Sequence, residues 1–205
     1  MPTQDPLDLA IRNATVASSQ GVTRMDIGVS GGRIVQLGAV GPATQEVDAS
    51  GLIVTPGGVD THCHLDQVEP GMGNGAESLA TGGRSALAGG TTSAVSFLAQ
   101  IPDHGLSEVF DESMRRGAAA RIDYSFHQII TDATPEIMAE VPQIIDRGIR
   151  SLKAFLTYDD ARLNDAEFLE VLAAARRGGA MVAVHCENYH AIGWLTRKLL
   201  ADGRT

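Results

Sequence analysis

The chain has 205 residues, of which 43% are apolar, 20% are charged and only 4% are aromatic. This composition excludes a disordered, collagen-like or disulfide-stabilised chain and is that of an ordinary globular protein with a sizeable core. The 25 acidic residues outnumber the 16 basic ones, and the formal charge of −9 would repel nucleic acids and anionic lipid surfaces. We therefore expect neither nucleic acid nor a membrane among its partners.

The start of the chain and the cysteines indicate the cellular location. The first residues carry no basic stretch followed by an apolar run, and no segment approaches the roughly 18 apolar residues that a membrane span needs. The two cysteines, Cys63 and Cys186, each stand next to a histidine instead of forming a spaced disulfide framework. These features predict a cytoplasmic protein with reduced thiols.

The first 56 residues alternate short β-segments with turn residues and are predicted to form a small β-rich domain. Ser30-Gly31-Gly32 lies between two of these segments, as a hairpin turn does. The Gly57-Gly58 pair is the only convincing boundary, so the predicted domains are residues 1–56 and 57–205. The strands expected in the first domain cover residues 7–11, 25–29, 33–37 and 52–54.

Beyond the boundary, apolar strand-like runs alternate with alanine-rich helical stretches. The strands begin about 30 residues apart, which is the spacing of βα units in a parallel sheet. Such units form either an open doubly wound sheet or the first five units of an eight-unit barrel, which needs about 250 residues. The chain length favours the open sheet. The choice between the two folds therefore depends on the candidate site residues. The predicted strands are 59–64, 92–98, 124–131, 152–157 and 181–185, and the predicted helices are 76–88, 106–116, 135–147, 165–177 and 189–201.

The segment Asp60-Thr61-His62-Cys63-His64 ends the first of these strands. Side chains two residues apart on a strand share a face, so His62 and His64 are expected to point the same way, with Asp60 behind them and Cys63 on the opposite side. Two imidazoles side by side suit a metal ion, although two histidines near a strand end can also be purely structural.

The other candidates are Lys153, which lies within the predicted strand 152–157, and His185, which ends the strand 181–185. A lysine within an apolar strand is costly unless its amine is neutral, paired or modified, or reaches water at the strand end. A carbamate formed from Lys153 and carbon dioxide would offer two oxygens to a pair of metal ions. His185 would lie at the same carboxyl end of the sheet, where sites of α/β proteins are built, and Glu187 is placed to orient it. The glycine-rich stretch 71–75 is predicted to be a mobile lid.

Four stretches in this order resemble the cyclic amidohydrolases, and within them the dihydropyrimidinase and D-hydantoinase group. They are Pro56-Gly57-Gly58-Val59-Asp60-Thr61-His62-Cys63-His64-Leu65-Asp66, Gly89-Gly90-Thr91-Thr92-Ser93, Ser151-Leu152-Lys153-Ala154-Phe155-Leu156-Thr157-Tyr158 and Val184-His185-Cys186-Glu187-Asn188. The resemblance covers essentially the whole chain. It implies a partial (β/α)8 TIM-type barrel, here its first five βα units, preceded by part of a small β-sandwich domain.

The resemblance also implies a site and a reaction. The site holds two Zn²⁺ per subunit, with His62 and His64 as ligands of the first, carboxylated Lys153 as the bridge and His185 as a ligand of the second. Tyr158 would hydrogen-bond the substrate and its developing oxyanion, and Leu65 would line the pocket. The implied reaction opens a dihydropyrimidine or hydantoin ring to an N-carbamoyl amino acid, and the implied assembly is a homotetramer.

The family takes a further histidine from its sixth strand and an aspartate from its eighth, and neither occurs before Thr205. We therefore expect an incomplete fragment that is inactive alone. Allantoinase and a non-catalytic assembly relative remain as alternatives. Dihydroorotase is disfavoured because it has an arginine where this chain has Asp66, whose charge would repel an anionic substrate.

Overall fold

The computed structural model describes residues 6–69, 73–74 and 77–204. The chain divides into two compact units, Met1–Gly57 and Gly58–Thr205. Across the described ranges, none of the helices combines the length and the apolar character that crossing a bilayer requires.

The first unit is a five-stranded sheet in the order β3-β2-β1-β4, with β5 also pairing with β1. The β2–β3 hairpin turns at Gly31 and Gly32, whose positive φ angles of 59° and 72° match the predicted tight turn. β4 was not expected, because its sequence is largely polar. The strands are β1 (Leu7–Ser18), β2 (Gly21–Ser30), β3 (Arg33–Gly38), β4 (Ala43–Asp48) and β5 (Ile53–Val54).

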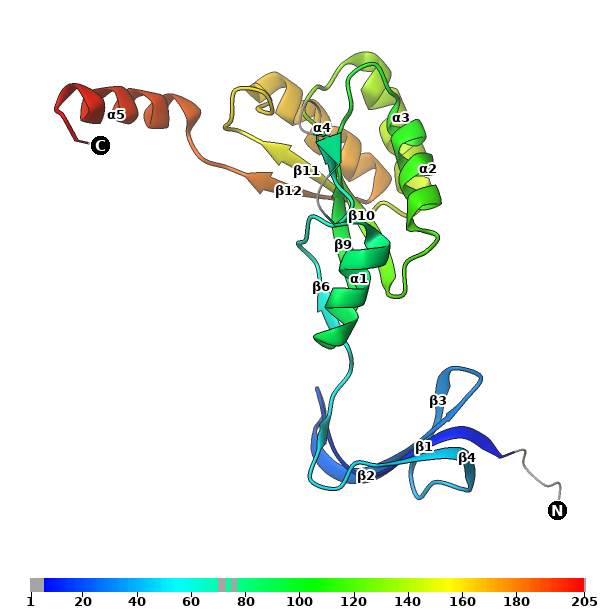
Figure 1. The fold of residues 1–205 in the computed structure, drawn as a ribbon. Helices are drawn as coiled ribbons and strands as arrows, with labels where there is room; N and C mark the ends of the chain where they lie inside the picture. Colours follow the sequence, from blue (N-terminus) through cyan, green and yellow to red (C-terminus); the bar gives the residue numbers. More distant parts are fainter. Residues whose placement is uncertain (1–5, 70–72, 75–76, 205) are drawn as a thin grey trace. The chain divides into compact units, whose positions relative to one another are not determined.

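The second unit is built on five parallel strands in the order β12-β11-β10-β9-β6, which form a curled half-barrel (Figure 1). The expected partial barrel is confirmed, and the open doubly wound sheet is not. Consecutive strands are neighbours, so β6 and β12 are the two edges of the sheet. The strands are β6 (Gly58–Asp60), β9 (Thr91–Leu98), β10 (Asp123–Ile129), β11 (Ser151–Phe155) and β12 (Met181–His185).

Helices alternate with these strands, and their starts follow local sequence signals. Thr134 and Asn164 cap α3 and α4, and Asn164 forms a capping box with Glu167. None of the residues of α5 is buried. The helices are α1 (Leu79–Ala88), α2 (Leu106–Gly117), α3 (Pro135–Asp146), α4 (Asp165–Gly178) and α5 (Tyr189–Ala201).

The main core lies between the half-barrel and the helices. Alternate strand residues such as Phe126, Leu152 and Ala154 pack there against residues of α2, α3 and α4. Side chains alternate between the faces of a strand, so Lys153, between Leu152 and Ala154, belongs to the inner face of the curled sheet. The helical layer thus leaves the inner face to the candidate site residues.

The first strand of the half-barrel is shorter than predicted. It ends at Asp60, and residues 61 and 62 form a bend, so His62 and His64 lie beyond the strand. Further on, β7 (Val68–Glu69) and β8 (Gly73–Asn74) pair antiparallel. Of the predicted lid 71–75, only residues 73 and 74 belong to the described residues.

Candidate metal centre

His62 and His64 lie side by side after β6, with ring centroids 5.8 Å apart. Strand alternation does not bring them together, because the strand has already ended. Instead, both rings pack on Phe97 of β9, at centroid distances of 4.8 and 4.9 Å. The Asp60 carboxylate accepts a hydrogen bond from the His62 backbone N–H at 2.9 Å and so fixes the bend. The pair suits one metal ion for a reason different from the predicted one.

Lys153 is buried on the inner face of β11, with 8% of its surface exposed. No carboxylate pairs with its amine among the described residues, and its Nζ lies 4.8 Å from the centre of the Phe155 ring. Burial lowers the pKa of Lys153, since removing an ammonium from water disfavours the charged form. Lys153 is thus a buried lysine shifted toward its neutral, nucleophilic form.

Tyr158, His185 and Glu187 form a hydrogen-bonded group at the ends of β11 and β12. The Tyr158 hydroxyl lies 3.2 Å from Nε2 of His185, and the same nitrogen contacts the Glu187 carboxylate. Tyr158 has a positive φ of 73° and is 51% exposed, so the turn after β11 presents its ring to solvent. An open pocket of about 580 Å³ lies beside Tyr158 and Glu187. Glu187 is therefore positioned to orient the His185 ring.

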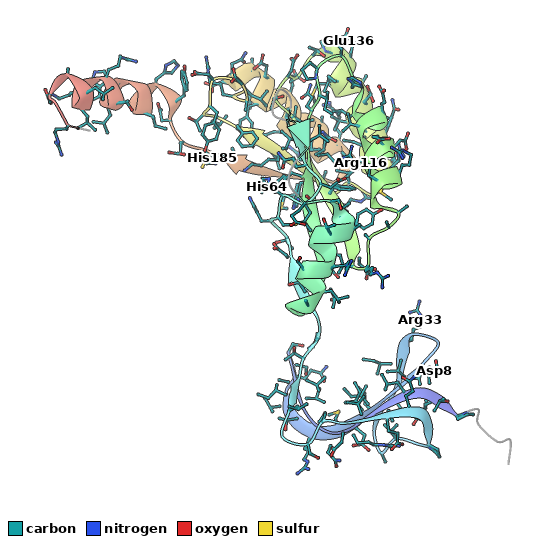
Figure 2. The ribbon with its side chains drawn as sticks, in the orientation of Figure 1. Asp8, Arg33, His64, Arg116, Glu136 and His185 are labelled. Atoms are coloured by element: carbon teal, nitrogen blue, oxygen red, sulfur yellow. The ribbon has the colours of Figure 1, made fainter. Side chains whose placement is uncertain are left out.

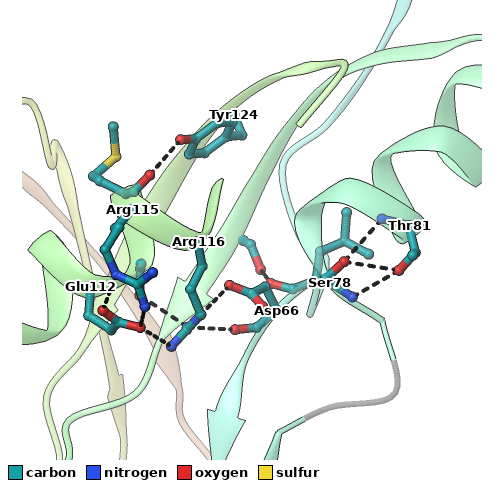
Figure 3. Close-up of polar contacts among 11 residues, drawn as sticks. Asp66, Ser78, Thr81, Glu112, Arg115, Arg116 and Tyr124 are labelled. Carbon is teal, nitrogen blue, oxygen red and sulfur yellow. Dashed lines mark hydrogen bonds and ion pairs between the residues drawn. The ribbon is translucent and has the colours of Figure 1, made fainter. Parts of the chain in front are cut away.

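The segment after His64 is fixed to the helical layer (Figure 3). Leu65 was expected to line the substrate pocket, but its side chain packs against Gly82 of α1 and the apolar core. Its carbonyl accepts a hydrogen bond from Ser96 Oγ at 2.7 Å. This anchoring holds the segment that follows the two histidines, with the Leu65 side chain partly buried against the core.

Asp66 is paired with Arg116 of α2, whose Nε lies 2.8 Å from the carboxylate, and Arg116 also donates to the Asp66 carbonyl (Figure 3). The Asp66 charge is offset by this ion pair. The expected repulsion of an anionic substrate by Asp66 therefore loses its physical basis.

The two cysteines and two further histidines lie in ordinary surroundings. Burial raises the pKa of the Cys63 thiol, whose sulfur contacts the Val95 carbonyl, so Cys63 is a packing residue. His104 lies in a loop and His190 on the exposed surface of α5. Cys186 is exposed.

His127 of β10 contacts both the bend before His62 and the neighbouring strand β11. Its Nε2 lies 2.8 Å from the Thr61 carbonyl, directly before His62. Its Nδ1 contacts the Ser151 hydroxyl, and its ring packs on Phe97 at 4.9 Å. The sequence signal for His127 is its position in an apolar strand. Its contacts could not be predicted, because Thr61 and Ser151 are distant from it in the sequence.

The family of the chain follows from comparison with known proteins. The model of the amidohydrolase family matches residues 53–201, which contain all of these candidate residues. The chain belongs to the amidohydrolase family. The N-terminal domain of the urease alpha-subunit also matches, over residues 1–61.

The similar amidohydrolases include hydantoinases. D-hydantoinase from Ralstonia pickettii is 37% identical over 97% of this chain, and D-phenylhydantoinase from Escherichia coli K12 is 36% identical over 95%. A solved D-hydantoinase structure has a TM-score of 0.89 and 35% identity, covering 97% of this chain and 44% of its own. A dihydropyrimidinase structure from Brevibacillus agri has a TM-score of 0.84 and 33% identity, covering 96% of this chain and 43% of its own. The resemblance to this group is confirmed, and the chain spans 43–44% of the length of these curated relatives.

The amidohydrolase residues fit part of a metal centre. His62 and His64 come from one edge of the half-barrel and His185 from the other, with β9, β10 and β11 between β6 and β12. Figure 2 shows His64 and His185 on the side of the sheet away from α2 and α3. No group of three or more His, Cys, Asp or Glu within the described ranges is arranged to hold a metal ion. The donor types suit zinc, and of the proposed ligands His62 and His64 lie side by side within the described ranges.

Proposed function

We propose that this amidohydrolase chain contributes to a zinc-dependent hydrolase that opens the cyclic amide bond of dihydropyrimidines or hydantoins. The products would be N-carbamoyl amino acids. The observation that carries the proposal is the burial of Lys153 without a carboxylate partner among the described residues, on the face of the half-barrel that also presents His185. The names and identities of the similar hydantoinases support the reaction class.

The burial of Lys153 supports its proposed conversion into the bridge between two metal ions. In its neutral form, the Lys153 amine attacks carbon dioxide, a C–N bond forms, and one proton leaves the nitrogen for solvent. The resulting carbamate carries one negative charge and two oxygens, which can each bind one cation. Burial favours this product indirectly, because it lowers the pKa of Lys153 and so increases the neutral amine that reacts.

We assign the ligands as the resemblance implies. His62 and His64 would hold the first Zn²⁺, carboxylated Lys153 would bridge, and His185 would hold the second. When bound, the two ions would supply a hydroxide near neutral pH and polarise the ring carbonyl. The contact of Nε2 with Glu187 and Tyr158 leaves Nδ1 as the nitrogen of His185 that has no hydrogen bond among the described residues.

Three side chains of this chain would orient the ligands and stabilise the reacting substrate. The Tyr158 hydroxyl, exposed beside His185, would donate to the ring carbonyl oxygen and to the oxyanion that develops from it. Glu187 would hold the His185 ring, and Asp60 would hold the bend that presents His62. The further histidine and aspartate of the family would come from sequence outside residues 1–205, so we expect this stretch alone to be inactive. The homotetramer and the cytoplasmic location stay predictions.

The test is metal analysis of the protein expressed from its complete reading frame, together with hydrolysis of dihydrouracil and hydantoin. We expect about two zinc ions per chain and ring opening, both reduced by Lys153→Ala and His62→Ala. Dialysis against a chelator should abolish hydrolysis, and zinc with bicarbonate should restore it better than zinc alone. A protein that binds no metal and leaves both rings intact would contradict the proposal and favour a non-catalytic assembly relative. Opening of allantoin in preference to either ring would favour allantoinase.

A further inference from the structure

His127 connects the two parts of the candidate metal centre that different strands supply. It lies on β10 in register with Phe97 of β9, and Ile129, two residues on, is in register with Lys153 of β11. Its Nδ1 contacts the hydroxyl of Ser151, two residues before Lys153 on the same strand face. Its Nε2 lies 2.8 Å from the carbonyl of Thr61.

The chemistry of these partners fixes the hydrogen positions. A carbonyl oxygen only accepts, so Nε2 of His127 carries the hydrogen and donates to Thr61. In the neutral ring Nδ1 is then an acceptor, and the Ser151 hydroxyl donates to it. The result is a chain of two hydrogen bonds that runs from β11 through the imidazole to the residue before His62.

The bend that holds the two histidines is therefore fixed on both sides of the Thr61–His62 peptide. The Asp60 carboxylate accepts from the His62 N–H, and the His127 ring donates to the Thr61 carbonyl. The ring of Phe97 packs against three histidine rings, those of His62, His64 and His127. This support is needed because β6 ends before the histidines, so no strand pairing fixes them.

We propose that His127 is a positioning residue of the metal centre. Through its bond to Thr61 it sets the place of His62 and His64 relative to the strand that carries Lys153. The inference rests on the proposed function, and it assigns His127 a role through the loop and no direct contact with metal or substrate. Second-layer contacts of this kind typically change metal affinity or activity about 10- to 100-fold when they are removed.

Three substitutions of His127 distinguish the effect of its hydrogen bond to Thr61 from that of its hydrogen bond to Ser151. His127→Phe removes both and keeps a flat ring on Phe97. His127→Gln can place an amide N–H near Nε2 and keep the bond to Thr61, whereas His127→Asn is too short and reaches only the Ser151 side. His104→Phe, in an exposed loop, is the matched control.

The measurement is the equilibrium affinity for Zn²⁺ of the metal-free protein from the complete reading frame, by competition with a chromophoric chelator. We expect affinity about 10- to 100-fold lower in His127→Phe and His127→Asn, and near the wild-type value in His127→Gln and His104→Phe. Amide hydrogen exchange over residues 60–66 of the metal-free proteins should rise in the same two variants. Thermal unfolding shows whether these two variants are folded. If His127→Phe does not fold, the comparison is made with His127→Asn.

The outcomes distinguish the two proposals. Wild-type protein that binds zinc, with unchanged affinity in His127→Phe and His127→Asn, would overturn the positioning role alone. Equal losses in His127→Gln and His127→Asn would also overturn it, because the bond to Thr61 would then not be the cause. Wild-type protein that binds no zinc would overturn the proposed function and this inference with it.

Discussion

Lys153 and Tyr158 lie on the same short stretch of chain but in opposite surroundings. Lys153 points inward from β11 and is almost fully buried, whereas Tyr158 follows the strand and is half exposed. The first environment favours a neutral amine that can be modified, and the second suits a hydroxyl that meets a substrate from solvent. At the scale of single residues, burial decides which chemistry each side chain can perform.

The buried amine of Lys153 should make the stability of the metal-free protein depend on pH. Burial lowers the pKa of the folded amine below its ordinary value of 10.5, so between the two values the unfolded chain binds more protons. The free energy of unfolding should therefore rise with pH in that window, and the penalty should be greatest below it. Lys153→Met should stabilise the metal-free protein at pH 7 and remove this slope. Urea unfolding measured from pH 7 up to 10.5 checks this, with exposed Lys198→Met as the control, and a destabilised Lys153→Met protein would contradict it.

The second residue-scale prediction concerns Tyr158→Phe in the zinc-loaded protein from the complete reading frame. The change removes the hydroxyl that contacts His185 but keeps the ring. Loss of one oxyanion donor should lower kcat for dihydrouracil about 100-fold while the zinc content stays constant. Tyr124→Phe is the matched control, because that hydroxyl contacts only the Met114 carbonyl among the hydrogen bonds found. Unchanged kcat in Tyr158→Phe would remove Tyr158 from the reaction.

At the scale of elements, the helices are joined to one another by a shared cap. The N-cap of α2 is Gly105, which has no side chain to accept from the first turn. Glu140 of α3 supplies the acceptor instead, and its carboxylate takes a hydrogen bond from the Ser107 N–H at 2.9 Å. A Cβ on Gly105 would meet that carboxylate at 2.6 Å, so the glycine makes room for it. The start of one helix thus depends on its neighbour.

This shared cap predicts that Glu140→Ala lowers the free energy of unfolding by about 1 kcal/mol, as loss of an N-cap does. Gly105→Ala should cost a similar amount, because it displaces the same carboxylate. The two effects should not add in the double variant, since both remove one interaction. Denaturant unfolding measures all three, and Glu170→Ala on the exposed side of α4 is the control. Additive losses would show that the residues act separately.

At the scale of the whole molecule, the second unit is a curled parallel sheet with two edges. β12 is one edge, and α5 after it exposes the large apolar side chains Ile192, Trp194, Leu195 and Leu200. Trp194 alone is 60% exposed. An unpaired strand edge and exposed apolar helix residues each favour association with other chains.

Residues 1–205 produced alone should therefore self-associate. Sedimentation analysis should show species larger than a monomer, which shift toward the monomer in Leu195→Glu, while Leu87→Glu on α1 should have a smaller effect. The protein from the complete reading frame should expose less apolar surface per residue to a fluorescent dye. A compact monomer of residues 1–205 with no dye binding would contradict this expectation.

The order of the elements could be predicted from the sequence because hydrophobic periodicity and caps are local. The strand 181–185 and the helix 189–201 were predicted with their observed bounds, and the other βα elements differ mainly at their ends. Polar β4 and the early end of β6 were not predicted, because pairing with a neighbour decides them.

The types and order of the functional groups can be read from the sequence: the His62–His64 pair, a lysine in an apolar strand, and His185 at the end of the next strand. The folded chain places Lys153 and His185 on one face of the sheet and brings the rings of His62 and His64 side by side. His62 and His185 belong to opposite edges of the half-barrel, and in a flat sheet five strands spaced about 4.8 Å apart would hold those edges far from each other. Curling turns both edges toward one inner face, and the contacts of Phe97 and His127 hold the His62 bend there. Curvature and such contacts depend on residues distant in the chain, which no local pattern encodes.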